Sequence, residues 1–349
     1  MYINWAHHYT PKISGTCSVM INSLFIYIVH DDKKVKLGCY RYLLIFFALY
    51  NFTSTAIDLM VPGCVLDHGY SFSFFIVGGV FEKRSYLGTM FVGFRCCIIS
   101  AAYCILHCHF VYRYMLLFHR KFLEHFFMPY GLLTSVGYSF MIMVLWFPVG
   151  LQNSACWIFA EADDERRNYI AAEFYERYGV DVYDINVITC LYNVSQSERL
   201  DILFFKEATS DVIKNSWIGI LIGTSISAYS VILCFIFGTF IILRLRSGEL
   251  NMSEKTKHLQ KQLIKVLIVQ SSIPVIVCFC PCFAAWYMPV FKLNVGNWIN
   301  WISAVAISFF PVLDPLALFY FIPVFRSRMN EIFRLKGKIR SGSTRISTI

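Results

Sequence analysis

The chain has 349 residues, of which 57% are hydrophobic and 15% are charged, and its formal net charge is +9. Ordinary soluble domains carry roughly 25% charged residues, so this chain has too little polar surface to enclose water-soluble cores. Its basic residues lie at the ends of apolar segments and are not grouped with aromatic residues, which argues against a nucleic-acid-binding protein. The composition therefore indicates a membrane protein.

Seven apolar segments are long enough to cross a bilayer as helices. The first carries Lys12 and several polar residues, but no basic region precedes it and no small-residue cleavage site is obvious, so we interpret it as a span and not as a signal peptide. We expect an all-α membrane protein, a seven-transmembrane helix bundle that occupies residues 1–322. The predicted spans are residues 11–29, 40–62, 86–112, 127–150, 216–243, 263–290 and 297–322.

Lysine and arginine are distributed unequally between the two sides of this bundle. The links after the first, third and fifth spans, together with the tail, hold 20 of them, against 4 on the opposite side when the long link at 151–215 is left out. Cytoplasmic links are enriched in these two residue types. The N-terminus is therefore predicted to lie outside and the C-terminus in the cytoplasm.

The tail at 323–349 is basic and amphipathic. Apolar residues recur at Phe325, Met329, Ile332 and Phe333, the i, i+4, i+7 and i+8 positions of a helix, with arginine and lysine residues around them. Such a segment is expected to lie along the inner lipid surface of the membrane. The alternative is a solvated, partly disordered tail.

The long outer link at 151–215 holds 12 acidic and 6 basic residues, a composition typical of a water-exposed segment. Residues 166–178 have the pattern of a short amphipathic helix, and residues 185–189 favour a strand. We expect this link to form a structured cap over the bundle. A flexible loop is the alternative.

The glycosylation motif Asn-x-Ser/Thr occurs three times, at Asn51, Asn193 and Asn251. Asn51 falls inside the second span and Asn251 on the cytoplasmic side, so only Asn193 should meet the glycosylation machinery. We therefore expect a glycoprotein that is modified at Asn193.

Two cysteines, Cys156 and Cys190, lie in the long outer link, where the compartment is oxidising. They could form a disulfide, with Cys64 as a competitor. Most of the other cysteines are intramembrane, and their scattered placement matches no spacing of zinc ligands. We therefore expect neither a metal site nor a cofactor.

Two charged residues inside the spans fall at a similar depth. Arg95 lies in the outer half of the third span, and Asp58 lies 17 residues after Arg41, from which the second span runs outward. Charges inside a membrane usually pair with one another or mark a functional site. Two interpretations stay open: a structural pair of Arg95 with Asp58, or a ligand pocket in which Arg95 receives an anionic or carbonyl-bearing compound and to which Trp286 contributes.

Several short stretches are distinctive in their order and spacing. They are residues 37–43 entering the second span, 109–114 leaving the third, 178–181 in the outer link, Gln270, Pro274 and Pro281 in the sixth span, and 310–316 in the seventh. Together they resemble the nematode serpentine chemoreceptors of the Str superfamily, most closely those of class J, and the resemblance runs almost end to end.

The resemblance implies a G protein-coupled receptor for olfaction, which binds a small environmental molecule and activates a heterotrimeric G protein. It also implies a multi-pass protein of the plasma membrane, in the sensory cilium of chemosensory neurons. It leaves open whether the receptor works alone or as a homo- or heterodimer.

Within that resemblance, Tyr112-Arg113-Tyr114 looks like the cytoplasmic arginine motif through which such receptors couple. A planar and permanently charged guanidinium suits contacts to the backbone carbonyls of a partner. The chain departs from the common pattern, because Tyr112 stands where an acid usually holds the arginine inactive. An arginine that only marks the inner edge of the membrane is the alternative.

Asp314 and Pro315 in the seventh span look like the family's counterpart of the activation switch in the last helix. An acid inside the membrane needs a polar interior, and proline removes a backbone donor and loosens the helix. Pro274 and Pro281 could similarly make the sixth span a kinked lever.

Other classes of membrane protein fit less well. A ligand-gated cation channel like the seven-span odorant receptors of insects is the second candidate, but those have the opposite orientation, and no selectivity filter is recognisable here. A transporter would show paired inverted repeats. An enzyme is not expected, since the sequence has no Ser/His/Asp set, no phosphate-binding loop and no paired carboxylates at one depth.

Overall fold

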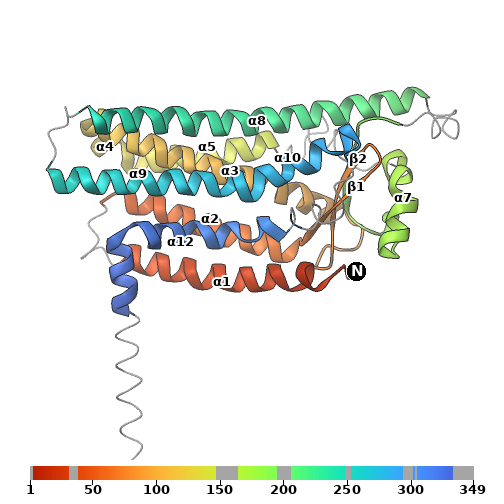
Figure 1. Cartoon of the computed structure of the whole chain (residues 1–349), viewed down its shortest axis with the longest axis horizontal. Helices are drawn as coiled ribbons and strands as arrows, with labels where there is room; N and C mark the ends of the chain where they lie inside the picture. The colour runs from red at the N-terminus through yellow and green to blue at the C-terminus, as the bar shows by residue number, and fades with distance from the viewer. Residues whose placement is uncertain are drawn as a thin grey trace, which may run out of the picture.

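The computed structural model describes residues 3–30, 38–146, 164–194, 206–247, 253–293, 302 and 305–332. Long helices lie side by side along its longest axis, and a small sheet lies at one end of them (Figure 1). The helices of this bundle are α1 (Trp5–His30), α2 (Tyr40–Met60), α3 (Tyr86–Phe118), α4 (Arg120–Phe126), α5 (Leu132–Trp146), α8 (Lys206–Arg246), α9 (Glu254–Pro274), α10 (Cys280–Tyr287) and α12 (Phe310–Phe321).

Six helical stretches are long and apolar enough to cross a membrane, and a seventh results when α12 is taken together with Pro323–Ile332. The segment Pro323–Ile332 is bent by 100° from α12, as expected for a tail that leaves the bundle. Phe325 anchors it, because its side chain is fully buried against Phe25 and Phe319. The rest of the predicted tail, 333–349, lies outside the described residues.

The fourth and sixth spans are each built from two helices. The turn η1 (Phe127–Gly131) joins α4 to α5, and the π-helical turn η3 (Val275–Phe279) joins α9 to α10. Pro274 precedes η3 and Pro281 follows it. Proline has no N–H to donate to the carbonyl four residues earlier, so the regular helical bonding of the sixth span is interrupted on both sides of η3.

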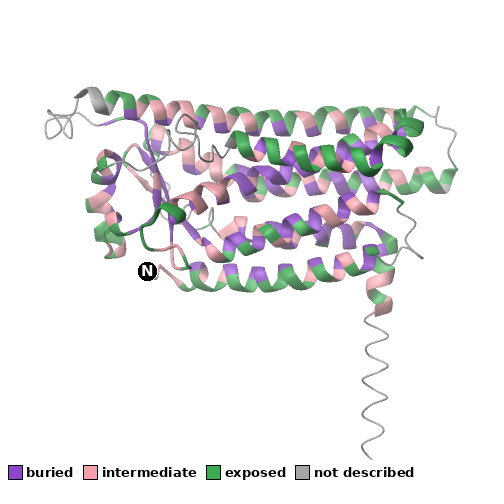
Figure 2. Cartoon of the chain, turned by 180° about the vertical axis from the view of Figure 1, so that it is seen from behind, coloured by how far each residue is buried: buried purple, intermediate pink, exposed green. Residues whose placement is uncertain are grey.

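α3 is the central helix and packs against α2, α5, α8 and α9. It begins after Ser85, whose Oγ accepts a hydrogen bond from the Gly88 N–H at 3.0 Å and so caps the first turn. Beyond this cap the helix is apolar on all sides, and Tyr103 and Phe110 are fully buried. Figure 2 shows the buried residues gathered in the interior helices and the exposed ones on the outermost helices. An all-round apolar sequence is typical of a helix surrounded by others.

Several helices run past the apolar segments that the sequence defines. α8 has 41 residues, which corresponds to about 60 Å, roughly twice the thickness of the hydrocarbon core. It begins at Lys206 and α1 begins at Trp5, whereas the predicted spans begin at 216 and 11. The apolar segment marks the part of a helix that lipid requires, but the helix itself continues into the polar residues at its ends.

Three antiparallel strands and one helix form what we call the cap. The strands occur in the order β1-β2-β3, the helix α7 covers one face of the sheet, and the bundle lies against the other face. The predicted helix at 166–178 is confirmed, and the strand predicted at 185–189 is found two residues further along the chain. The elements of the cap are β1 (Gly63–His68), β2 (Ser71–Ile76), α7 (Asp164–Tyr178) and β3 (Val187–Leu191).

The β1–β2 hairpin comes from the link between the second and third spans, and the sequence analysis did not predict it. Gly69 supplies the positive φ of 54° that its tight turn requires. In β2, Phe72, Phe74 and Ile76 face the bundle while Phe75 faces α7. This alternation with a period of two is the sequence pattern from which the strand could have been predicted.

Asn186 fastens the cap to the central helix. Its side chain is fully buried, its Nδ2 donates to the carbonyls of Phe81 and Lys83 at 2.7 Å each, and its Oδ1 accepts from the Ser85 N–H at 3.0 Å. Ser85 is the residue that caps α3. The cap and the start of α3 are therefore joined through one amide side chain.

The two faces of the sheet separate the cysteines of the cap. Cys64 on β1 packs under α7, whereas Cys190 on β3 faces the bundle. The alternative disulfide between Cys64 and Cys190 is therefore wrong, because the two side chains lie on opposite faces of the sheet. Cys156, the predicted partner of Cys190, lies outside the described residues, so that pair stays a prediction.

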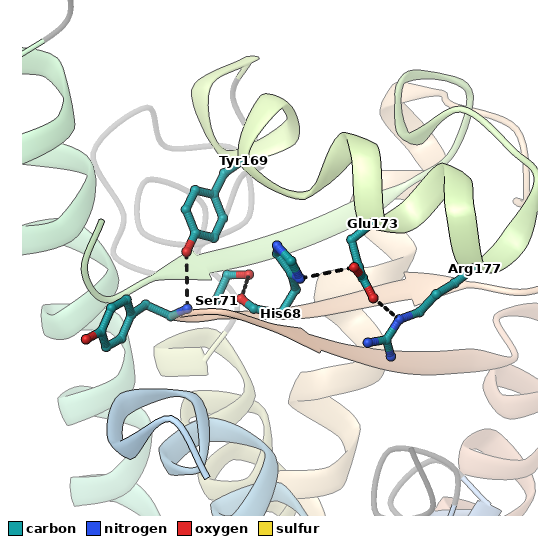
Figure 3. Close-up of polar contacts among 6 residues, drawn as sticks. His68, Ser71, Tyr169, Glu173 and Arg177 are labelled. Carbon is teal, nitrogen blue, oxygen red and sulfur yellow. Dashed lines mark hydrogen bonds and ion pairs between the residues drawn. The ribbon is translucent and has the colours of Figure 1, made fainter. Parts of the chain in front are cut away.

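A row of polar side chains links β1 to α7 (Figure 3). His68 Nδ1 lies 3.5 Å from Glu173, which also pairs with Arg177 one turn later on α7. The neighbouring Asp67 has its Oδ1 buried without a hydrogen-bond partner among the described residues. Burial raises the pKa of Asp67 to about 7, and the positive charge of Arg177 opposes this shift only in part.

We expect Asp67→Asn to make the protein more stable at neutral and alkaline pH. The Asp67 carboxyl has a pKa near 3.8 in the unfolded chain and about 7 in the folded one. The folded state therefore binds more protons, and the wild-type protein loses stability as the pH rises from about 4 to about 7. Melting temperatures of the purified wild type and variant should diverge over this range and stay apart by a constant difference above it. Parallel curves would contradict the prediction.

Candidate functional site

Arg113 is buried at one end of α3, which we call the inner end in keeping with the predicted orientation. Its guanidinium carbon lies 3.9 Å from the centre of the Tyr40 ring on α2. Its Nη1 donates to Gln260 Oε1 on α9 at 3.2 Å. In the described part of the chain no carboxylate pairs with it. An aromatic face and a neutral amide hold this arginine, in place of an acid.

Tyr40 is itself held in position. Its hydroxyl lies 2.9 Å from Nδ1 of His109, and the two rings meet edge to face. His109 precedes Arg113 by one helical turn and shares its face of α3. The ring that receives the guanidinium is thus fixed by the helix that carries the guanidinium.

The two tyrosines that flank Arg113 face different helices. The ring of Tyr112 lies 4.9 Å from that of Tyr40 on α2, and the ring of Tyr114 lies 5.6 Å from that of Phe237 on α8. The three side chains of the predicted motif therefore contact α2, α8 and α9. These contacts converge on the inner end of the bundle.

Asp314 of α12 is fully buried and accepts a hydrogen bond from Gln270 Nε2 of α9 at 2.9 Å. The next residue, Pro315, has no N–H to donate to the carbonyl of Pro311. Asn22 of α1 supplies the missing donor, with its Nδ2 at 2.9 Å from that oxygen. The loosened turn of α12 is therefore bonded to α1 and α9.

Asn22 connects this group to α2. Its Oδ1 accepts from Asn51 Nδ2 at 3.1 Å, and the hydroxyls of Ser18 and Thr55 lie 2.7 Å apart. Asn51 is 1% exposed, which agrees with the prediction that it is not a glycosylation site. One polar group thus joins α1, α2, α9 and α12.

The π-helical turn η3 places Phe279 against the central helix. Its ring stacks on that of Tyr103 with centroids 4.5 Å apart and planes 19° from parallel. Tyr103 is buried, and its hydroxyl has no hydrogen-bond partner among the described residues. The break in the sixth span, between Pro274 and Pro281, is therefore in direct contact with α3.

Arg95 and Asp58 form an ion pair in the outer half of the bundle. Their side chains are 5% and 9% exposed, so the pair is buried between α3 and α2. Arg95 Nε has no hydrogen-bond partner in the described residues. Trp286 packs with the cluster of apolar residues under the cap and lies beside Phe283, so the structure places it next to the sheet.

Comparison with known proteins decides the family. A family model described as "Serpentine type 7TM GPCR chemoreceptor Srj" matches residues 1–329. The chain belongs to this family. Serpentine receptor class J-38 of Caenorhabditis elegans is 30% identical over 356 residues, which cover 100% of both chains.

More distant relatives and one solved structure agree with this membership. Serpentine receptor class r-10 of Caenorhabditis briggsae is 26% identical and covers 97% of this chain and 94% of its own. G-protein coupled receptor str-33 of Caenorhabditis elegans is 24% identical, with coverages of 90% and 87%. Squid rhodopsin superposes with a TM-score of 0.53 at 13% identity, over 95% of this chain and 85% of its own, which shows the seven-transmembrane receptor fold.

The chemoreceptor is therefore a multi-pass membrane protein of the G protein-coupled receptor class. The family consists of receptors and not of enzymes. Membership in it favours a receptor over the ligand-gated channel, which was the second candidate from the sequence.

Sequence reasoning named the charged and proline residues of this site and offered Asp58 as a partner of Arg95, but it missed the other partners. Gln260, Asn22 and His109 were not predicted to bond Arg113, Pro311 and Tyr40. The available signal was polarity itself, since an amide inside an apolar span needs a partner. Which partner it finds depends on helix packing.

We expect the Arg95–Asp58 pair to show strong coupling in a double-mutant cycle. Arg95→Met or Asp58→Leu alone leaves one buried charge without its partner, at a cost of about 3–5 kcal/mol of stability. The double variant should lose far less, because it removes both charges. Thermal unfolding of purified receptor measures this.

The exposed pair Arg120–Glu124, whose side chains are 69% and 57% exposed, provides the control. Arg120→Met with Glu124→Leu should show no measurable coupling. Additive losses at Arg95 and Asp58 would contradict the expected coupling.

Proposed function

We propose that this chemoreceptor is an olfactory receptor of the plasma membrane of sensory cilia, which couples to a heterotrimeric G protein through Tyr112, Arg113 and Tyr114. One observation carries the proposal: Arg113 is buried at the inner end of the bundle, and its partners among the described residues of two other helices are uncharged. Such contacts are strong enough to restrain a side chain and weak enough to be exchanged for those of a partner protein.

The proposed activation moves the inner end of α9 away from α3. This movement breaks the hydrogen bond of Gln260 to Arg113, and the guanidinium then turns to the carbonyl groups of the G protein. The hinge is the segment from Pro274 through η3 to Pro281, where the backbone bonding of the sixth span is interrupted. The bond from Gln270 to Asp314 makes α12 follow α9.

In the proposed receptor the ligand binds in the outer half of the bundle, near Arg95, Asp58 and Trp286. It shifts an existing equilibrium toward the conformation with the open inner end. The tail that begins at Pro323 lies along the inner lipid surface, and residues 1–322 form the receptor domain. This mechanism is compatible with a receptor that acts alone and with one that acts as a dimer.

We expect Arg113→Ala to abolish G protein activation while leaving the receptor at the cell surface. We expect Tyr40→Leu to raise the basal activity about thirtyfold, because a cation–π contact in a desolvated site contributes about 2 kcal/mol to the resting state. Nucleotide exchange on the G protein in membranes, normalised to surface receptor, measures both.

Tyr42→Leu is the matched control, since the Tyr42 hydroxyl bonds to Arg41 and its ring does not contact Arg113. It should leave basal activity unchanged. An active Arg113→Ala variant would overturn the proposed coupling residue. A Tyr40→Leu variant as quiet as the wild type would show that the ring does not restrain Arg113.

We expect a glycan on Asn193, which is exposed at the end of β3. An N-terminal epitope should be stained on intact cells and a C-terminal epitope only after permeabilisation. Asn193→Gln should abolish the mobility shift on deglycosylation, whereas Asn51→Gln should not. A stained C-terminus on intact cells would place Arg113 outside the cytoplasm and overturn the proposed coupling.

A further inference from the structure

The buried ion pair of Arg95 and Asp58 carries no net charge. Both side chains are at least nine-tenths buried, and three described thiols also lie within reach of the charge of Arg95: Cys96 on α3 itself, Cys278 in η3 and Cys282 on α10. A thiol in an apolar interior stays neutral. The arginine therefore has its full compensating charge before any ligand arrives.

This neutrality decides which ligands can bind there. A carboxylate beside Arg95 would also lie beside Asp58, and the group would carry one uncompensated negative charge in a medium of low dielectric constant. An ammonium ion would leave an uncompensated positive charge for the same reason. An uncharged molecule leaves the balance of charge unchanged.

One donor of Arg95 is nevertheless unused. Its Nε is buried and has no hydrogen-bond partner among the residues that the structure describes. Buried donors are nearly always paired in folded proteins, with protein, water or ligand. An acceptor oxygen would satisfy this donor without adding charge.

Aromatic side chains extend from this donor toward the cap. Phe91 lies one turn before Arg95 on the same face of α3, only partly buried, and its ring stacks on that of Phe81 at 4.4 Å. Phe94 lies edge to face with Phe91. An apolar chain of the ligand can pack on these rings while its oxygen accepts from Nε.

We propose that Arg95 and Asp58 form a site for an uncharged molecule that carries a hydrogen-bond acceptor oxygen on an apolar chain, such as a ketone or an ester. The proposal deepens the proposed chemoreceptor function and rests on it. Asp58 makes the site selective, because it cancels the charge that would otherwise attract acids. Arg95 supplies the donor.

Binding to the purified receptor tests this inference without any G protein. The probes are 2-heptanone and methyl hexanoate, compared with hexanoate, hexylammonium and heptane, and the readout is the melting temperature. The ketone and the ester should raise it in the wild type, and the other three should not. The double variant Arg95→Met with Asp58→Leu, which keeps the site uncharged, should lose the response.

Asp58→Asn tests whether the preference for uncharged ligands over carboxylates can be reversed. It leaves the charge of Arg95 uncompensated, so hexanoate should bind at least tenfold more tightly than to the wild type and should outrank methyl hexanoate. Glu173→Gln, which removes a carboxylate of the cap, should keep the wild-type preference. Should Asp58→Asn fail to fold, the wild type and the double variant still decide the outcome.

Three results would overturn the proposal. They are stabilisation of the wild type by hexanoate or hexylammonium, a ketone response that survives in the double variant, and a wild type that responds to none of the probes. A receptor that binds the ketone but activates no G protein would overturn the proposed coupling and leave this site intact. The two failures are therefore distinguishable.

Discussion

Most of the polar groups described inside the bundle find their partners within the protein, because hydrocarbon offers none. The partners lie on other helices. The ion pair joins α3 to α2, Asn22 joins α1 to α12, and Gln270 joins α9 to α12. In an environment where apolar side chains gain little by leaving lipid for protein, such contacts fix which helices are neighbours and at what height they meet.

The kind of contact changes along the length of the bundle. The outer half holds a full ion pair, the middle an amide bonded to a carboxyl group, and the inner end a guanidinium on an aromatic ring. The first is costly to break, whereas the last has replaceable partners. The outer end is further fixed by Asn186, which fastens the cap to α3. The molecule is thus rigid where the cap lies and least restrained at its inner end.

The sequence predicted much of the fold because hydropathy, charge and periodicity are local properties. The spans, the helix at 166–178 and the strand at 185–189 follow from them. The hairpin of β1 and β2 was overlooked, although Phe72, Phe74 and Ile76 alternate with smaller or oppositely facing residues. A disulfide of Cys64 with Cys190 was wrong, since spacing along the chain does not reveal which face of a sheet a residue occupies.

The partners of the site depend on contacts between residues far apart in the chain. Gln270 and Asp314 were both named from motifs, but their bond required the packing of α9 on α12. Asp58 and Arg95 were matched by counting residues along two antiparallel spans, which works because helices have a fixed rise. No such count reveals that Asn22 bonds the carbonyl freed by Pro315.

The ring of Tyr40 carries no net charge and accepts no proton. A carboxylate in its place could be neutralised by a proton, and the ion pair would then be lost. The contact of Arg113 with an aromatic face involves no such protonation. In the proposed mechanism the resting state would therefore keep this restraint when the pH of the cytosol falls.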